Sequence, residues 1–148
     1  MTDNSPVLVV EDESDSVFLL ERAFRKAEVP TAIRSVPSVA SAIEYLTHAT
    51  AAGKKADYPL PAFVLLDLKL PRKSGLEVLK WLRAHECLHS MIVVIFTSST
   101  ARDDVVSAYQ AGANSYLVKP SSLGVLTEVA RDLSNYWLRR NEPPIPAY

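Results

Sequence analysis

The chain has 148 residues, a net charge of −1 and a hydrophobic content of 48%. This length favours one domain, this apolar content excludes a disordered protein, and the balanced charge gives no reason to expect nucleic-acid or membrane binding. The single cysteine, Cys87, excludes an internal disulfide. No apolar run reaches the roughly 20 residues that span a bilayer, and the start lacks the features of a signal peptide. We therefore expect one cytoplasmic domain over residues 1–148.

Strand-like and helix-like segments alternate along the chain. Short apolar runs predict the strands, and apolar residues at helical spacing predict the helices. The expected strands are residues 7–10, 32–36, 63–66, 91–96 and 114–118, and the expected helices are 14–28, 38–52, 74–86, 100–111 and 122–138. Residues 53–61 are long for a helix-to-strand connection and predict a surface insertion. The core covers about residues 6–138, and a Pro-rich tail, 139–148, follows it.

Two helix starts carry capping signatures. Ser74 followed by Glu77 predicts a capping box, and Thr100 followed by Asp103 predicts a second. Gly112 is placed to end the helix that Thr100 begins. These signals set the boundaries of the third and fourth helices.

The regular alternation of strands and helices predicts an α/β fold. A parallel sheet with right-handed crossovers and helices on both faces is the arrangement that such alternation allows. We therefore expect a flavodoxin-like (βα)5 three-layer sandwich, with a five-stranded parallel sheet in the order 2-1-3-4-5. Ligands of such folds bind at the carboxyl edge of the sheet. The binding position lies between the first and third strands, where the strand order reverses.

Polar residues follow the strands at that edge. Glu11 and Asp12 come after the first strand, Asp67 after the third and Lys119 after the fifth, while Thr97 comes at the end of the fourth. Carboxylates that meet in one cleft repel one another unless a cation lies among them, and oxygen ligands with open water positions suit Mg²⁺. The sequence therefore predicts a magnesium site at this edge.

The same residues could support phosphoryl transfer. A carboxylate such as Asp67 can be a metal ligand and also a nucleophile that forms an aspartyl-phosphate. Lys119 would neutralise the phosphoryl oxygens. Thr97 could donate a hydrogen bond to the phosphoryl group only after it arrives, which is the state-dependent contact that a switch requires.

These residues resemble the receiver domain of two-component response regulators. The matching positions are Glu11-Asp12, Asp67 with Pro71 and Gly75 after it, Thr97-Ser98, Tyr116 and Lys119-Pro120. The resemblance covers about residues 6–138, and it is specific because each position falls in order along the chain. Tyr116 matches the switch aromatic of that family, which turns inward when the hydroxyl residue moves toward the phosphate.

The resemblance implies the chemistry of the site. A sensor histidine kinase would donate phosphate to Asp67, which would make the chain a phosphoprotein and not an enzyme beyond its own phosphorylation and dephosphorylation. Mg²⁺ would be held by Asp12, Asp67 and the backbone carbonyl of Lys69, with Glu11 acting mostly through water. The Lys119-Pro120 peptide bond is usually cis in the family.

A narrower resemblance links the chain to the small receivers that partner bacterial phytochromes. It rests on the 53–61 loop, on residues 70–79 and on the lack of sequence after Tyr148, which predicts a stand-alone receiver without an output domain. In that group, homodimers form through the fourth helix, the fifth strand and the fifth helix. Tyr136 and Trp137 are the candidates for such a contact.

Other interpretations stay open at this point. The chain could be a pseudo-receiver that binds partners without phosphate, or an intermediate in a phosphorelay. A small-molecule phosphatase is discounted because Lys69 stands where its general acid would be. Tyr116 has a structural role as readily as a switching one. Neither Lys69 nor Ser99, which flank the expected approach of water to Asp67, would orient that water well, so we expect slow self-dephosphorylation.

Overall fold

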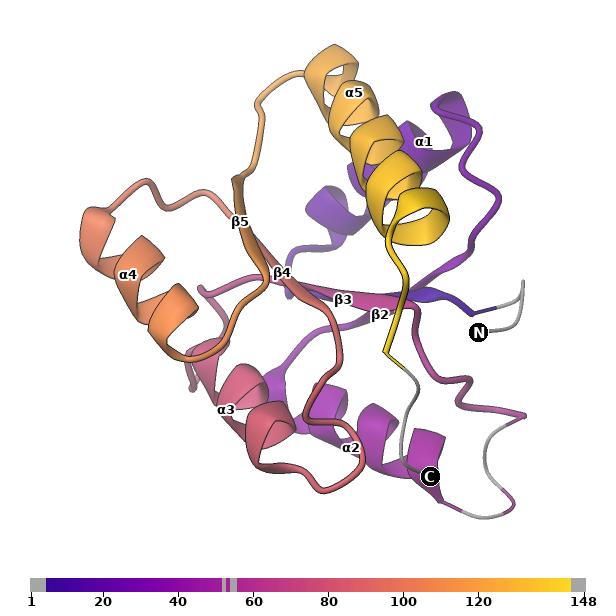
Figure 1. Ribbon diagram of the computed structural model, residues 1–148. Coiled ribbons are helices and arrows are strands. Elements are labelled where there is room, and N and C mark those ends of the chain that lie inside the picture. Colours follow the sequence, from indigo (N-terminus) through magenta and orange to yellow (C-terminus); the bar gives the residue numbers. More distant parts are fainter. Residues whose placement is uncertain (1–4, 52, 54–55, 145–148) are drawn as a thin grey trace.

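The strands form one parallel sheet with the predicted topology. The computed structural model describes residues 5–51, 53 and 56–144. Its strands are β1 (Val7–Val10), β2 (Ile33–Val36), β3 (Phe63–Leu66), β4 (Val93–Thr97) and β5 (Ser115–Val118). They pair in the order β2-β1-β3-β4-β5, so the flavodoxin-like architecture is confirmed (Figure 1).

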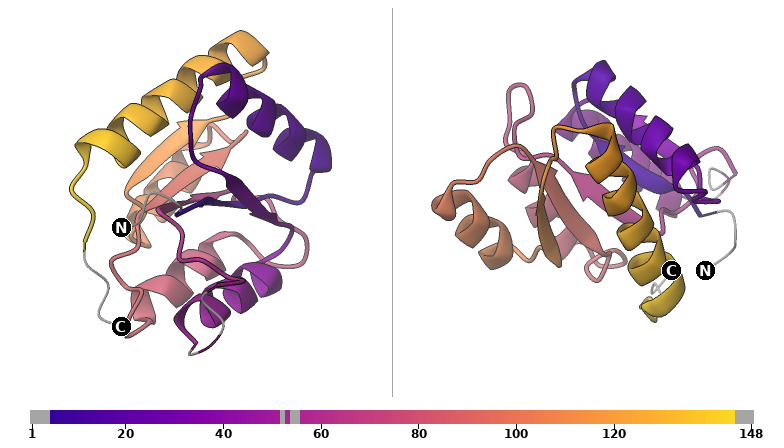
Figure 2. Two further views of the ribbon diagram at one scale, coloured as in Figure 1. Left: turned by 90° about the vertical axis from the view of Figure 1, so that its right-hand side faces the viewer. Right: turned by 90° about the horizontal axis from the view of Figure 1, so that it is seen from above.

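Helices cover both faces of this sheet. They are α1 (Ser14–Lys26), α2 (Val39–Thr50), α3 (Leu76–Ala84), α4 (Arg102–Gln110) and α5 (Leu123–Leu133), which continues as a π-helical segment, η1 (Ser134–Arg140). α1 and α5 lie together on one face, and α2 and α3 lie on the other (Figures 1 and 2). The predicted tail therefore begins later than expected, because residues 139–140 still belong to η1.

The alternation of side chains along each strand divides the core into two layers. All residues of β1, β3 and β4 are buried, as expected for central strands with helices on both faces. Leu8, Val64 and Ile95 are part of the layer under α2, α3 and α4. Their strand neighbours Val9 and Leu65 are part of the layer under α1 and α5. The strands are therefore held rigidly, and so are the residues at their ends.

Both predicted capping boxes are wrong. The N-cap of α3 is Gly75, without a side-chain cap, and the Ser74 hydroxyl accepts only the Leu76 N–H, at 3.2 Å. The N-cap of α4 is Ala101, not Thr100. At α3, the Gly75 N–H donates to Leu68 O at 3.0 Å, a contact with the loop after β3 that a local capping pattern does not report. The predicted end at Gly112 fits the structure, since Gly112 has φ +105° directly after the C-cap of α4.

Arg83 connects α3 to the loops that precede β4 and β5, at the amino-terminal edge of the sheet. Its guanidinium donates to the carbonyl oxygens of Gly112, His89 and Met91 at 2.8–3.0 Å and to Asn114 Oδ1 at 3.0 Å. Burial lowers the pKa of this group. No sequence pattern predicts this network, because its acceptors are mostly backbone carbonyls.

The predicted insertion at 53–61 is partly outside the described residues, since 54 and 55 are not among them. Its later part packs on α2. Tyr45 Oη donates to the Pro59 carbonyl at 2.6 Å, and the Tyr58 ring contacts the rings of Tyr45 and His48. His48 is half-buried and is therefore a packing residue. Within the described part of the chain, no helix is long and apolar enough to cross a membrane.

Candidate functional site

Backbone hydrogen bonds extend the sheet by one residue at its carboxyl edge and fix the site residues there. The N–H of Glu11 donates to Val36 O at 3.0 Å, and the N–H of Asp67 donates to Val10 O at 3.1 Å. On the other side, the N–H of Lys119 donates to Thr97 O at 2.8 Å. The positions of these side chains thus follow directly from the strand order.

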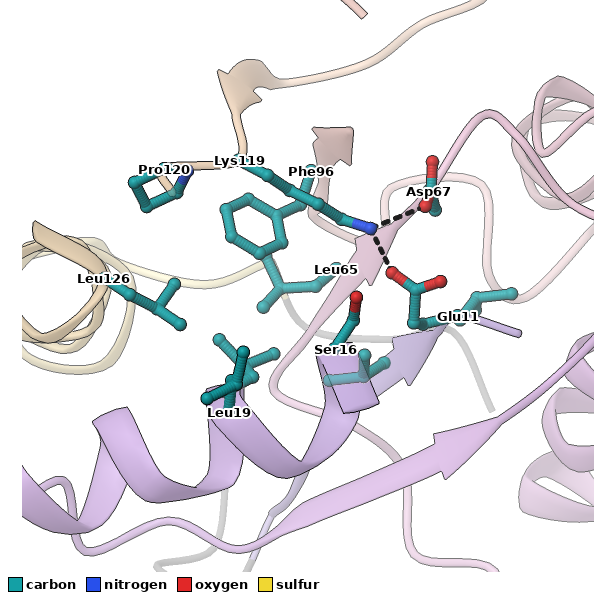
Figure 3. Close-up of a pocket in the computed structure, with 12 residues that line it drawn as sticks. Glu11, Ser16, Leu19, Leu65, Asp67, Phe96, Lys119, Pro120 and Leu126 are labelled. Carbon is teal, nitrogen blue, oxygen red and sulfur yellow. Dashed lines mark hydrogen bonds and ion pairs between the residues drawn. The ribbon is translucent and has the colours of Figure 1, made fainter. Parts of the chain in front are cut away.

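Lys119 brings the two carboxylates together. Its Nζ lies 2.8 Å from Asp67 Oδ2 and donates a second hydrogen bond to Glu11 Oε1 (Figure 3). The exposed fractions of the side chains are 14% for Lys119, 5% for Glu11 and 6% for Asp67. An apolar cavity lined by Leu19, Phe96 and other residues of α1 and the sheet adjoins this trio. The trio carries one net negative charge and is largely shielded from water.

The second oxygen of each carboxylate accepts a backbone N–H. Glu11 Oε2 accepts from Glu13 N at 3.1 Å, and Asp67 Oδ1 accepts from Lys69 N at 3.0 Å. Each carboxylate therefore has two donors and a fixed orientation. Such hydrogen bonds to charged acceptors are stronger than those between neutral groups.

These contacts shift the pKa values in different directions. Burial opposes ionisation of Asp67, but the hydrogen bonds from Lys119 and Lys69 and the charge on Lys119 outweigh it, so its pKa is lowered. Burial dominates at Glu11 and raises its pKa despite the bond to Lys119. For Lys119, the hydrogen bonds and charges of the two carboxylates outweigh burial and raise the pKa. Asp67 is thus the carboxylate that stays ionised most firmly.

The other predicted metal ligands lie outside this trio. Asp12 is exposed, and within the described residues no three acidic, His or Cys side chains are grouped closely enough to form a preassembled metal cage. The Lys119-Pro120 bond is trans, as are the other described peptide bonds, in contrast to the cis bond that the family resemblance implied. A trans bond is the more stable form of most X–Pro bonds.

The predicted switch residues form a short chain beside the trio. Thr97 is fully buried at the end of β4, and the Ser99 N–H lies 3.5 Å from its Oγ1. Tyr116 donates from its hydroxyl to the Ser99 carbonyl at 3.0 Å, and its ring packs against the core under α2, α3 and α4. Tyr116 therefore has a structural contact and also a direct link to the loop after β4.

The sequence analysis missed one residue near the site. Asp104, in the first turn of α4, accepts a hydrogen bond from Ser99 Oγ and lies 3.5 Å from Lys69 Nζ. Asp103 and Asp104 are adjacent residues of the same type. Only the helical phase of α4 in the folded protein distinguishes them, so no sequence signal could have selected Asp104.

The candidate dimer residues differ in exposure. Tyr136 is 53% exposed, whereas Trp137 packs against the core layer under α1 and α5. Val106 and Tyr109 of α4 and Val118 of β5 are also exposed. Exposed apolar residues are therefore present on α4, β5 and η1, and Tyr136 is the more exposed of the two candidates.

The chain belongs to the response regulator receiver domain family, whose model matches residues 7–131. The probable methanogenesis regulatory protein FilR2 of Methanothrix harundinacea is 37% identical over 141 residues, which are 95% of this chain and 88% of FilR2. The response regulator Rcp1 of Synechocystis is 29% identical over 132 residues, which are 89% of this chain and 88% of Rcp1.

Solved structures of response regulators have the same fold as this chain over nearly its whole length. RPA3017, a response regulator in red light signalling of R. palustris, has a TM-score of 0.88 and 30% identity over 95% of this chain and 99% of its own. The phosphorylated cyanobacterial phytochrome response regulator RcpA has a TM-score of 0.84 and 28% identity over 96% of this chain and 99% of its own. The Mn²⁺-bound form of Rcp1 has a TM-score of 0.80 and 28% identity over 95% of this chain and 99% of its own. The predicted likeness to phytochrome-associated receivers is thus confirmed.

Proposed function

We propose that this receiver accepts a phosphoryl group on Asp67 from a sensor histidine kinase and thereby changes a protein-contact surface. The observation that carries the proposal is the Asp67–Lys119 contact of 2.8 Å at the carboxyl edge of the sheet. It places an ionised carboxylate next to an ammonium group that can neutralise the incoming phosphoryl oxygens. RcpA, a relative with the same fold, has been crystallised in phosphorylated form.

In the transfer, an Asp67 oxygen forms a bond to phosphorus while the bond between phosphorus and the imidazole nitrogen of a phosphohistidine breaks. The lowered pKa of Asp67 keeps it ionised and ready to attack at neutral pH. Thr97 lies at the neighbouring strand end, where its hydroxyl would donate to a phosphoryl oxygen. Tyr116, which contacts Ser99, would follow the resulting movement of the loop after β4.

The residues present fit a divalent cation such as Mg²⁺. Asp12, Asp67 and the Lys69 carbonyl would hold it, with Glu11 nearby, and all four offer the oxygen ligands that Mg²⁺ prefers. A preassembled cage is not required, because Mg²⁺ in proteins usually keeps several waters and only one or two carboxylates. The net negative charge of the trio supports this fit, since Lys119 is the one cation in contact with the carboxylates of Glu11 and Asp67 among the described residues. When bound, the ion would offset phosphoryl charge.

The kinase partner we propose is a phytochrome-type histidine kinase, because RPA3017 is a response regulator in red light signalling and RcpA is a phytochrome response regulator. FilR2, which is similar to this chain in sequence, is a probable methanogenesis regulatory protein. Histidine kinases draw their phosphate from ATP, so we place the reaction in the cytoplasm. The chain would act as a switch and not as an enzyme on other substrates.

Intact-mass spectrometry tests the phosphoacceptor. After incubation of wild type and Asp67→Asn with a small acyl phosphate and Mg²⁺, we expect one phosphate adduct on wild type and none on the variant. The adduct should also disappear when EDTA replaces Mg²⁺. Asp67→Asn should remain folded, because the exchange removes the excess negative charge of the trio and keeps an acceptor for Lys69 N–H. A labelled Asp67→Asn would show a different acceptor, and an unlabelled wild type would favour the phosphate-independent pseudo-receiver.

We propose a second copy of this chain as a partner of the exposed apolar residues on α4, β5 and η1. Val106, Tyr109, Val118 and Tyr136 are exposed apolar side chains on these elements, and a symmetric contact between two copies would cover them. Tyr136→Ser should therefore shift sedimentation equilibrium toward monomer, whereas Phe18→Ser, which removes an exposed aromatic of α1, should not. Equal masses for Tyr136→Ser and wild type would contradict this contact.

A further inference from the structure

One carboxylate of α4 joins the two loops that border Asp67. Asp104 Oδ2 accepts the hydrogen bond from Ser99 Oγ and lies 3.5 Å from Lys69 Nζ. Ser99 belongs to the loop after β4, and Lys69 belongs to the loop after β3. A single oxygen atom therefore holds together the side chains of two segments that come from different strands.

Both partners of Asp104 are also bound to the site through their main chains. Lys69 N–H donates to Asp67 Oδ1 at 3.0 Å. Ser99 N–H approaches Thr97 Oγ1, and its carbonyl accepts the Tyr116 hydroxyl. Asp104 is therefore connected to the Asp67 carboxylate through Lys69, and to the switch residues through Ser99.

The surroundings of Asp104 keep it ionised. The hydrogen bond from Ser99, and then the charge of Lys69, lower its pKa. The first turn of a helix also favours an anion. The side chains of Lys69 and Asp104 are 68% and 32% exposed, so salt will screen their ion pair.

We propose that Asp104 is a positioning residue that slows the loss of phosphate from Asp67 by holding Lys69 and Ser99 together beside the approach of water. The inference rests on the proposed function. In hydrolysis, the water oxygen bonds to phosphorus while the bond between phosphorus and the Asp67 oxygen breaks. The protons of water leave with inorganic phosphate, and Asp67 is restored as a carboxylate. Lys69 and Ser99 flank the approach of that water but do not orient it. When Asp104 holds their side chains in place, they obstruct the approach of water to phosphorus.

The test measures how fast the phosphate adduct is lost. The full chain is labelled with a small acyl phosphate and Mg²⁺, the donor is removed, and the adduct is followed by intact mass. Asp104→Asn keeps the size of the side chain but removes its charge. We expect it to lose phosphate about two- to fivefold faster than wild type, the range expected when one exposed ion pair is lost. Added salt at about 1 M should bring wild type toward the rate of the variant.

Asp103→Asn is the matched control. Asp103 has the same charge in the same helical turn and is exposed, so this variant should lose phosphate at the wild-type rate. Lys69→Met should reproduce the acceleration, and adding Asp104→Asn to it should change the rate little, because both remove the same contact. A merely structural role of Asp104 would not produce this lack of additivity.

The outcomes separate this inference from the proposed function. Equal or slower loss in Asp104→Asn, or equal acceleration in Asp103→Asn, overturns the role of Asp104 while leaving the phosphoacceptor assignment intact. A wild type that takes no label refutes the proposed function, and the inference fails with it.

Discussion

Replacing Lys119 with Met should destabilise the protein by about 3–5 kcal/mol at neutral pH, the usual cost of removing one partner from a buried ion pair. The methionine fills the space of the lysine stem next to the apolar cavity beside Leu19 and Phe96. The ammonium is lost, however, and Glu11 and Asp67 remain buried without a counter-charge. Because small domains have total stabilities of about 5–15 kcal/mol, this loss should be evident in urea unfolding followed by tryptophan fluorescence.

The cost of this substitution should depend on pH. In the wild type, Asp67 has a lowered pKa, so its stabilising contribution is complete above its ordinary value of 3.8 and is lost as pH falls through the lower native pKa. Without Lys119, burial raises the pKa of both carboxyls. Each carboxyl group then takes up a proton as pH falls, and the protein no longer has the cost of burying an unpaired charge there. The difference in the free energy of unfolding should therefore be largest near pH 7 and shrink toward pH 4.

Two further variants control this prediction. Lys69→Met removes a lysine whose side chain is 68% exposed, and its effect on stability should be below about 1 kcal/mol. The double variant with Glu11→Gln and Lys119→Met should recover part of the loss, because only one carboxylate then lacks a partner. A small and pH-independent effect of Lys119→Met would mean that water reaches the trio and screens it.

The sequence was enough to predict the sheet and the residues at its carboxyl edge. Continuous apolar runs identify β1, β3 and β4 because these strands are buried on both faces, and the alternation with helices leaves little choice of topology. Once the order of strands is known, Asp67 and Lys119 must approach each other. The metal ligands, by contrast, stay a prediction, because Asp12 is exposed and lies outside the trio of Glu11, Asp67 and Lys119.

Details that depend on tertiary contacts could not be predicted. Ser74 and Thr100 both have the local pattern of an N-cap, yet the N-cap of each helix lies one residue later, at Gly75 and Ala101. Arg83 looked like any basic residue of a helix because its partners are carbonyls, which every sequence contains. Asp104 could not be distinguished from Asp103, because their roles differ only in the direction that each faces.

Gly75→Ala should also be strongly destabilising, although the backbone conformation of Gly75 is one that any residue can adopt. A Cβ at this position would lie 2.0 Å from the carbonyl oxygen of Asp67 and 3.1 Å from Leu68 Cα. Both are backbone atoms that cannot rotate away as a side chain would. Overpacking typically costs 1–3 kcal/mol, and we expect about 3 kcal/mol or more here because the backbone must move.

The backbone that must move carries the phosphoacceptor, so Gly75→Ala should also slow labelling of Asp67 under conditions in which the variant is still folded. Gly124→Ala is the matched control, because no atom lies within 4 Å of its added Cβ. Gly124 is in α5, where Ala is preferred over Gly by up to about 1 kcal/mol, so this variant should unfold at equal or higher urea concentration than wild type. If Gly75→Ala matched Gly124→Ala in both stability and labelling, the packing of α3 against the Asp67 loop would not be what positions the acceptor. If it unfolds early and labels slowly, the start of α3 and the geometry of the site have a common cause, which explains why a local capping pattern failed to predict that start.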